Sequence, residues 1–166
     1  IYKTLQNLNY TFDYKVIKAS DFGLPQHRPR VYMVGFYKPY IKKMYQEIGF
    51  AFPEKIPLKK SISDILGGVV STDMKAKKER KIGFTLRVGG VSSPINDRRN
   101  WDGYIVNKKI MRIKPKHGLQ MMGFPRKFKF PVTEREAMKQ LGNSVAVNVV
   151  KEIGKRIIRD LSLYGK

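Results

Sequence analysis

Apolar residues near the start of the chain follow the pattern of β-strands. Residues 14–19 form a short β-prone segment that runs into a polar turn at residues 20–23. Residues 31–36 are a continuous apolar run, as expected of a strand that is buried on both faces. Two helices are predicted next, one over residues 39–49, with proline near its start and glycine at its end, and a shorter one over residues 61–66.

The C-terminal segment carries the clearest helical patterns. Thr133 and Glu136 have the spacing of a capping box, in which each side chain bonds to the backbone amide of the other residue. We expect this helix to end at Leu141, with Gly142 in the left-handed conformation. A second helix is predicted from an apolar stripe whose members recur every four positions, namely Val145, Val149, Ile153, Ile157 and Leu161.

The middle of the chain lacks a core pattern. Residues 71–81 form a charged connector, and residues 83–106 are expected to be irregular loops with short strands at 84–88 and 104–106. Strands near the start and helices near the end therefore indicate an α/β fold with a loop-rich region between them.

Net charge indicates the kind of partner. The chain contains 34 Lys and Arg against 13 Asp and Glu, a net charge of +21, and residues 75–129 hold sixteen of the basic residues and three of the acidic ones. Such an excess favours an acidic partner, either nucleic acid or a membrane surface. No apolar run approaches the roughly 18 residues that a spanning helix requires, so nucleic acid is preferred. The alternative is that the lysines only keep exposed loops soluble.

The chain contains no cysteine. This excludes disulfides, thiolate metal ligands and a thiol nucleophile within the chain, and it fits an intracellular protein. No metal site is predicted.

Gln26, Arg28 and Arg30 alternate along the segment that leads into the second predicted strand. On an extended backbone, residues two apart project to the same side, and Pro29 disfavours the helical alternative for Arg28. One amide and two guanidiniums on one face can bind phosphates or a carbonyl-bearing ring through directed hydrogen bonds. The alternative is two surface arginines that precede a buried strand.

Three motifs, in this order, resemble the late motifs of the DNA cytosine-5 methyltransferases. They are Gln26-x-Arg28-x-Arg30 before a strand, Met122-Gly123-Phe124-Pro125, and Gln140-Leu141-Gly142-Asn143-Ser144-Val145. The resemblance implies the last strands and C-terminal helices of a methyltransferase-type mixed sheet, plus a small, loop-rich α+β target-recognition domain. The expected boundaries are residues 1–38 for the strands of the catalytic domain, 39–130 for target recognition and 131–166 for helices that return to the catalytic domain.

The resemblance also implies roles for single residues. The family extrudes its target base from the duplex, and Arg30 would contact the carbonyl oxygen of that cytosine and stabilise negative charge on the ring. Arg28 would help bind a backbone phosphate and brace the catalytic loop, with Gln26 in the same catalytic motif. Asn143, Ser144 and Val145 would close one side of an S-adenosylmethionine pocket. Taken alone, these three residues are also consistent with an ordinary helix end followed by the cap of the next helix.

The target-recognition region should lie between the first and second motifs. Arginine suits guanine edges and asparagine suits adenine edges in the major groove. The residues expected to bind DNA are Thr85, Arg87, Gly89, Gly90, Asn96, Arg98, Arg99, Asn100, Lys75, Lys77 and Lys78. Trp101 is expected to anchor its loop rather than to stack on a base, and His117, where the family has glutamate, is expected to be structural.

The early motifs of the family are missing from this chain, including the cofactor loop, the Pro-Cys nucleophile and the Glu-Asn-Val segment. Three explanations stay open: a fragment, which the start at Ile1 favours; one subunit of a split methyltransferase; or a non-enzymatic DNA-binding module that reuses the recognition region. The first two imply a part of a restriction-modification enzyme that completes methyl transfer from S-adenosylmethionine to cytosine C5. The expected partners are double-stranded DNA and an N-terminal catalytic half, in the cytoplasm of a prokaryote and without a membrane.

Overall fold

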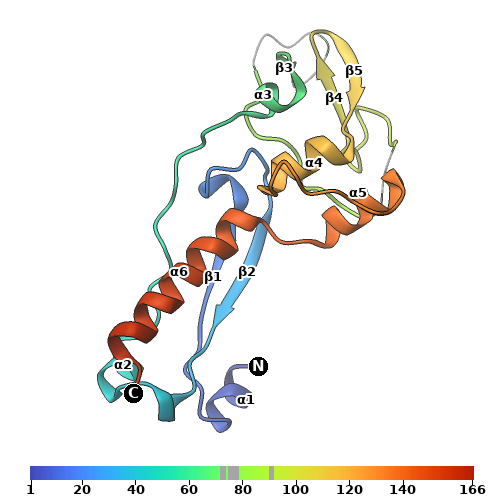
Figure 1. Ribbon diagram of the computed structural model, residues 1–166. Coiled ribbons are helices and arrows are strands. Elements are labelled where there is room, and N and C mark those ends of the chain that lie inside the picture. The colour runs from blue at the N-terminus through green and yellow to red at the C-terminus, as the bar shows by residue number, and fades with distance from the viewer. Residues whose placement is uncertain (72–73, 75–78, 90–91) are drawn as a thin grey trace. The chain divides into compact units, whose positions relative to one another are not determined.

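The computed structural model describes residues 1–71, 74, 79–89 and 92–166 (Figure 1). Its elements, in chain order, are α1 (Tyr2–Asn7), β1 (Asp13–Lys18), the 3-10 helix η1 (Ala19–Asp21), β2 (Pro29–Val34), the 3-10 helix η2 (Lys38–Tyr40), α2 (Lys43–Ile48), α3 (Ile62–Leu66), β3 (Val70–Ser71), β4 (Gly103–Val106), β5 (Lys109–Arg112), α4 (Pro115–Met122), α5 (Glu134–Asn143) and α6 (Val147–Tyr164). The fold is mixed α/β. The chain divides into two compact units: unit 1 contains residues 1–17, 29–55 and 149–166, and unit 2 contains residues 18–28 and 56–148.

Unit 1 contains a two-stranded sheet of β1 and β2, together with α1, α2 and most of α6. One face of the sheet is buried through Ile17 and Val34. The described residues do not cover the other face, whose large apolar side chains are each more than half exposed; they are Tyr14, Val16, Val31 and Met33. The sheet of unit 1 therefore carries an apolar face that the described part of the chain leaves open.

A buried carboxylate connects α2 to α6 inside unit 1. The hydroxyl of Tyr45 donates to Oδ2 of Asp160 at 2.6 Å, and Nε of Arg156 lies 3.0 Å from Oδ1 of the same carboxylate. Burial and the nearby carboxylate raise the pKa of Tyr45 above its usual range, so the phenol stays a proton donor. These contacts hold α2 against α6 within unit 1.

Unit 2 contains the antiparallel sheet β3-β4-β5 and the helices α3, α4 and α5. In the β4–β5 ladder Gly103 pairs with Arg112, and Val106 pairs with Lys109. One hydrophobic core joins these elements, and it consists of Ile62, Ile65, Leu66, Val70, Leu86, Trp101, Tyr104, Val106, Ile113, Met121, Met122 and Leu141.

Two local predictions in unit 2 are wrong. Gly142 is not a left-handed helix end, because α5 continues through Asn143 and ends at Ser144 in an extended conformation. Its lack of a side chain serves a close approach instead, since a Cβ at this position would lie 2.8 Å from the carbonyl oxygen of Arg87. Residues 84–88 do not form a strand. Side chains take the place of a neighbouring strand as hydrogen-bond partners of their backbone, at Phe84 and at Leu86.

Other predictions agree with the structure in part. At the start of α5 the hydroxyl of Thr133 accepts from the amide of Glu136, which is one of the two bonds of the predicted capping box; the return bond from the Glu136 side chain is not found among the described residues. A complete capping box lies at α3, between Ser61 and Asp64. The expected boundaries at residues 38 and 130 differ from those of the two units, because residues 39–55 pack in unit 1 and residues 131–148 in unit 2. In the described residues, no helix is both long and apolar enough to cross a membrane.

Candidate functional site

The guanidinium of Arg28 joins three distant segments of unit 2. Nη1 donates to the carbonyl of Leu86 at 3.0 Å, and Nη2 donates to the carbonyls of Gly142 at 2.8 Å and Ser144 at 2.6 Å. The side chain is buried, with 3% of its surface exposed. A planar guanidinium has several donors in fixed directions, which suits it to three acceptors at once. Arg28 thus connects the first motif to residues 84–88, which we call the recognition segment, and to the third motif.

Gln26 makes the parallel connection to the second motif. Its Nε2 lies 3.1 Å from the sulfur of Met122, near the C-terminus of α4, and its Oε1 accepts from the amide of Leu86 at 3.4 Å. The side chain is fully buried. The expected alternation therefore holds for Gln26 and Arg28, which are both enclosed in unit 2, but Arg30 does not share their environment.

Arg30 is exposed and belongs to β2 in unit 1. Its Nη1 donates to the carbonyl of the adjacent Pro29 at 2.7 Å. Because this contact is local and open to solvent, the guanidinium is available to a ligand. Arg28, by contrast, presents its donors to backbone carbonyls, so the geometry does not support the phosphate contact that the resemblance implied for it.

The predicted cofactor residues lie at the end of α5 and in the turn before α6. Asn143 is exposed, and so is Val145. Ser144 is engaged internally, because its hydroxyl donates to the carbonyl of Leu141 at 2.9 Å and its own carbonyl accepts from Arg28. Asn143 and Val145 are thus the members of this group that can reach a ligand.

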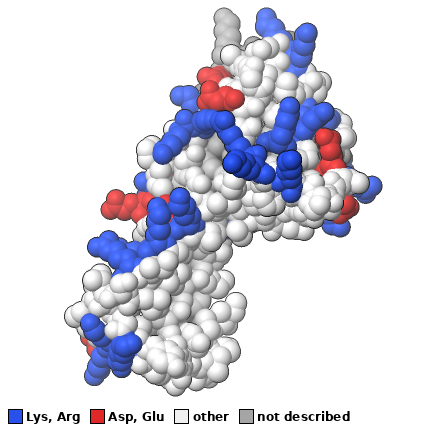
Figure 2. Space-filling view, in the orientation of Figure 1, with Lys and Arg blue, Asp and Glu red and all other residues white. Residues whose placement is uncertain are grey.

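Basic side chains surround a hollow of about 340 Å³ in unit 2. We call it the basic hollow and define it by His27, Arg80, Arg87 and Arg98. Arg80 lies over the ring of Phe84, with 4.2 Å between its guanidinium carbon and the ring centroid, and this cation–π contact fixes its position. Figure 2 shows many Lys and Arg side chains on the face of unit 2 that it presents.

The sequence predicted Arg87 and Arg98 as DNA-binding residues, whereas Arg80 and His27 of the basic hollow were not among the predicted contacts. Arg80 lies within a charged connector, where it resembles the neighbouring lysines, and His27 stands between two of the residues that define the first motif, Gln26 and Arg28. The phenylalanine four residues after Arg80 is the one signal that could have identified it, because an aromatic ring can hold a guanidinium.

The predicted base-contacting residues differ in how free their side chains are. Arg99 forms a bidentate pair with Asp97, with Nη2 at 2.7 Å from Oδ2, and these hydrogen bonds lower the pKa of Asp97 to about 2. Asn100 is buried, with its amide nitrogen and oxygen both bonded to the backbone of Gly103. The expectation that Asn100 contacts DNA is therefore not supported, since both of its polar groups are occupied. Arg98 is exposed and forms no ion pair within the described part of the chain.

The remaining predicted DNA-binding residues have mixed environments. The hydroxyl of Thr85 donates to the carbonyl of His27, and the carbonyl of Gly89 accepts from Nε1 of Trp101 at 2.7 Å. Trp101 is buried, so it anchors its loop as predicted. Arg87 and Asn96 are exposed. Four predicted residues lie outside the described part of the chain, namely Lys75, Lys77, Lys78 and Gly90.

His117 serves as the cap at the start of α4. Its Nδ1 accepts from the amide of Lys114 at 3.1 Å, which is the role that a glutamate three residues into a helix has in a capping box. Partial burial, together with the charges of Lys116 and Lys114, lowers the pKa of His117. The neutral form that the cap requires is therefore favoured, and the structural role expected for this histidine is supported.

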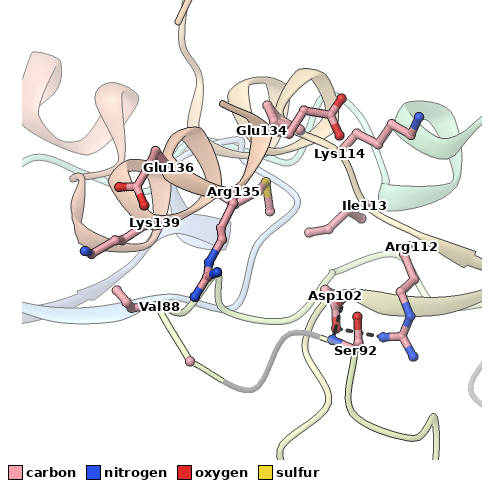
Figure 3. Close-up of a pocket in the computed structure, with 13 residues that line it drawn as sticks. Val88, Ser92, Asp102, Arg112, Ile113, Lys114, Glu134, Arg135, Glu136 and Lys139 are labelled. Carbon is pink, nitrogen blue, oxygen red and sulfur yellow. Dashed lines mark hydrogen bonds and ion pairs between the residues drawn. The ribbon is translucent and has the colours of Figure 1, made fainter. Parts of the chain in front are cut away.

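A larger cavity, of about 840 Å³, lies elsewhere in unit 2 (Figure 3). Its walls come from the loop near Val88, the end of β5 and α5. Of the predicted site residues in the described chain, Gly89 alone lines it. Asp102 and Arg112 form an ion pair in the wall of this cavity, which Figure 3 marks with dashed lines.

Comparison with known proteins identifies the family. The chain matches the model of the C-5 cytosine-specific DNA methylase family over residues 1–89 and 75–159, and it belongs to that family. Similar relatives include the type II methyltransferase M.SsoII of Shigella sonnei, 33% identical over 97% of this chain and 48% of the relative. Another is M.DsaV of Dactylococcopsis salina, 32% identical over 96% of this chain and 51% of the relative. The chain spans about half the length of the curated relatives it matches.

Solved structures share the fold at lower sequence identity. A variant of Spodoptera frugiperda DNMT2 aligns with a TM-score of 0.64 at 17% identity, over 94% of this chain and 60% of that one. The Dnmt2 methyltransferase of S. pombe aligns with a TM-score of 0.64 at 16% identity, over 96% and 61%. The mixed α/β architecture is thus that of methyltransferase structures.

Proposed function

We propose that this chain is the C-terminal part of a DNA cytosine-5 methyltransferase of a restriction-modification system. In it, the chain recognises a specific sequence in double-stranded DNA and completes the site where a methyl group passes from S-adenosylmethionine to cytosine C5. The observation that carries the proposal is the position of Arg28, whose guanidinium holds the recognition segment at Leu86 and the third motif at Gly142 and Ser144. One buried cation holds both segments, which supports a single site in which DNA recognition and cofactor binding are combined.

The open face of unit 1 supports the need for a second, N-terminal half. A sheet of two strands is marginal in isolation, and contiguous exposed apolar surface is typical of an interface. The face that carries Val16 and Val31 is the surface that this half would cover. Because the curated relatives are methyltransferases of about twice this length, we prefer an incomplete enzyme to a non-enzymatic DNA-binding module.

The residues after α5 fit one wall of a cofactor site. Asn143 is exposed and carries an amide that can bond to a polar ligand, and Val145 offers an exposed apolar side chain beside it. S-adenosylmethionine supplies the methyl group when bound. Within this chain, Asn143 and Val145 would hold it, and Ser144 would keep the turn in place through its bonds to Leu141 and Arg28.

The basic hollow is the proposed contact with DNA. Three arginines and a histidine around one depression present donors to phosphate oxygens or base edges. The single carboxylate in its lining, that of Asp97, is already paired with Arg99. The hollow is therefore more basic than its composition indicates, and binding there should weaken steeply as salt concentration rises.

This chain alone is expected to transfer no methyl groups, because it contains no cysteine nucleophile. Activity should return when an N-terminal half with the Pro-Cys motif is supplied. The measurement is incorporation of labelled methyl groups from S-adenosylmethionine into duplex DNA, and the control is the same half with its cysteine replaced by serine. Methyl transfer by the purified chain would contradict the proposal. If the reassembled protein binds duplex DNA without transferring methyl groups, the DNA-binding module becomes the better account.

Arg98→Ala is expected to lower the preference of the complete enzyme for its target sequence by about 1–3 kcal/mol, the value of a good contact with a base edge. Arg99→Ala is the matched control and should have a smaller effect, because Asp97 already occupies its guanidinium. The measurement is duplex affinity for the target and for random sequence. Equal losses on both duplexes for Arg98→Ala would show that Arg98 contacts a phosphate and not a base.

A further inference from the structure

An ion pair between a buried carboxylate and a half-buried arginine lies at the base of the loop formed by residues 92–100, which we call the recognition loop. Asp102 is 3% exposed and precedes β4, and Arg112 is the last residue of β5. Nη1 of Arg112 lies 2.9 Å from Oδ1 of Asp102. The amide of Ile113 donates to the carbonyl of Asp102 at 2.8 Å, so the ladder between the two strands fixes both members of the pair.

The same two side chains hold the backbone of the recognition loop. The amide of Ser92 donates to both carboxylate oxygens of Asp102, at 3.3 and 3.1 Å. Nη2 of Arg112 donates to the carbonyl of Ser93 at 2.9 Å. Figure 3 shows Arg112 extending from its strand to Asp102, with Ser92 beside the carboxylate. The pair therefore connects a rigid strand ladder to the first residues of the loop.

The rest of the recognition loop is also constrained from within. The amide of Asp97 donates to the carbonyl of Pro94 and the amide of Asn100 donates to the carbonyl of Asp97, both at 2.9 Å, which makes two consecutive turns. Asn100 bonds through its side chain to Gly103 at the start of β4. Asn96 and Arg98 lie within these turns with exposed side chains.

We propose that Asp102 and Arg112 are positioning residues for sequence discrimination. They fix the entry of the recognition loop at Ser92 and Ser93, so that Asn96 and Arg98 meet the DNA in a single orientation, while neither member of the pair contacts DNA. A preorganised loop discriminates well because a wrong base pair leaves its fixed donors unpaired. A loop released at Ser93 can adjust to wrong base pairs, and discrimination falls. This inference rests on the proposed function.

Arg112→Lys is the most informative substitution. Lysine keeps a charge that can pair with Asp102, so the buried carboxylate is not left alone, but one ammonium cannot reproduce the fork that also reaches Ser93. Asp102→Asn is the second variant; it keeps the shape of the side chain and an acceptor for Ser92 but removes the ion pair. Lys109→Ala is the matched control, an exposed cation on the same strand as Arg112.

The experiment uses the complete methyltransferase that contains this chain. It methylates a library of random-sequence duplexes, and bisulfite sequencing gives the ratio of kcat/KM at the preferred site to that at sites with one base pair changed. For Arg112→Lys and Asp102→Asn we expect this ratio to fall by about tenfold at one or more positions. The turnover at the preferred site and the salt dependence of binding should stay near those of the wild type and of Lys109→Ala.

The possible failures of this experiment can be told apart. If the wild-type enzyme methylates no duplex, the proposed function is wrong and the positioning role is wrong with it. If the wild type discriminates and both variants discriminate equally well, the proposed function stands and the positioning role is overturned. A lower unfolding midpoint with an unchanged ratio has the same meaning, because it assigns the pair to stability alone.

Discussion

Replacing Arg30 with alanine is expected to lower the turnover of the complete methyltransferase by about a hundred- to a thousandfold, the effect of losing one oxyanion donor, roughly 3–4 kcal/mol. Duplex affinity should change little, because the contact with the cytosine ring strengthens only as the ring becomes anionic. The structure leaves Arg30 exposed and bonded locally to the carbonyl of Pro29, so its guanidinium can turn toward a ligand. The measurement is the single-turnover rate together with the duplex dissociation constant.

Two further variants test whether the effect belongs to the guanidinium of Arg30. Arg30→Lys should restore part of the rate, since a point charge replaces the planar fork only in part. Arg159→Ala is the matched control, because Arg159 is an exposed arginine of the same unit, and it should leave the rate unchanged. Should Arg30→Ala weaken duplex binding while the rate stays the same, Arg30 contacts the DNA backbone and has no role in catalysis.

The sequence predicted those features of the fold that depend on a residue and its near neighbours in the chain, such as a helix cap. The cap of α5 at Thr133 follows from a hydroxyl that accepts from the amide three residues away. The position of Gly142 shows where such reasoning stops. Glycine before asparagine is typical of a helix end, but here the loop at Arg87 approaches the helix so closely that any side chain would collide with it. That approach is a long-range contact, and no local pattern contains it.

The first motif shows the same limit for the candidate site. Alternation predicts that Gln26, Arg28 and Arg30 lie on one face only if the whole segment is extended. The strand begins only at Pro29, and the residues before it enter unit 2, where carbonyls from residues 86, 142 and 144 surround the guanidinium of Arg28. These acceptors are 58, 114 and 116 residues away in the chain. The chemistry of an arginine is evident in a sequence, but the identity of its acceptors is not.

The predicted DNA-binding residues also differ in their hydrogen-bond partners, which residue type alone does not show. Residue type suggested that Arg98, Arg99 and Asn100 were equivalent candidates. Their partners make them different, since Asp97 occupies Arg99 and the backbone of Gly103 occupies Asn100. The pairing of Arg99 with Asp97 could have been inferred from a carboxylate two residues away, whereas the burial of Asn100 depends on the fold of β4. Arg98 is therefore the strongest candidate of the three for a base contact.

Replacing Arg28 with alanine is expected to destabilise the chain and to separate the three motifs. Removing this guanidinium deprives three backbone carbonyls of their hydrogen-bond donor. The bonds to Leu86 and Gly142 are buried, and the bond to Ser144 is partly buried. An unsatisfied buried polar group costs about 1–3 kcal/mol, so we expect a loss of about 3 kcal/mol or more in the free energy of unfolding. The measurement is denaturant unfolding of the reassembled enzyme, followed by methylation assays at a temperature where the variant is folded.

The affinities of the folded Arg28→Ala variant for S-adenosylmethionine and for DNA distinguish this role from a phosphate contact. If Arg28 positions the third motif, the variant should bind S-adenosylmethionine more weakly, because the turn at Asn143 and Val145 loses its support at Ser144. Arg28→Lys should recover little, since one ammonium cannot bond to three carbonyls in different directions. Arg87→Ala is the matched control, an exposed arginine of the same unit that should alter DNA binding and leave unfolding nearly unchanged. A stable Arg28→Ala variant with weakened duplex binding and normal cofactor affinity would restore the phosphate contact as the role of Arg28.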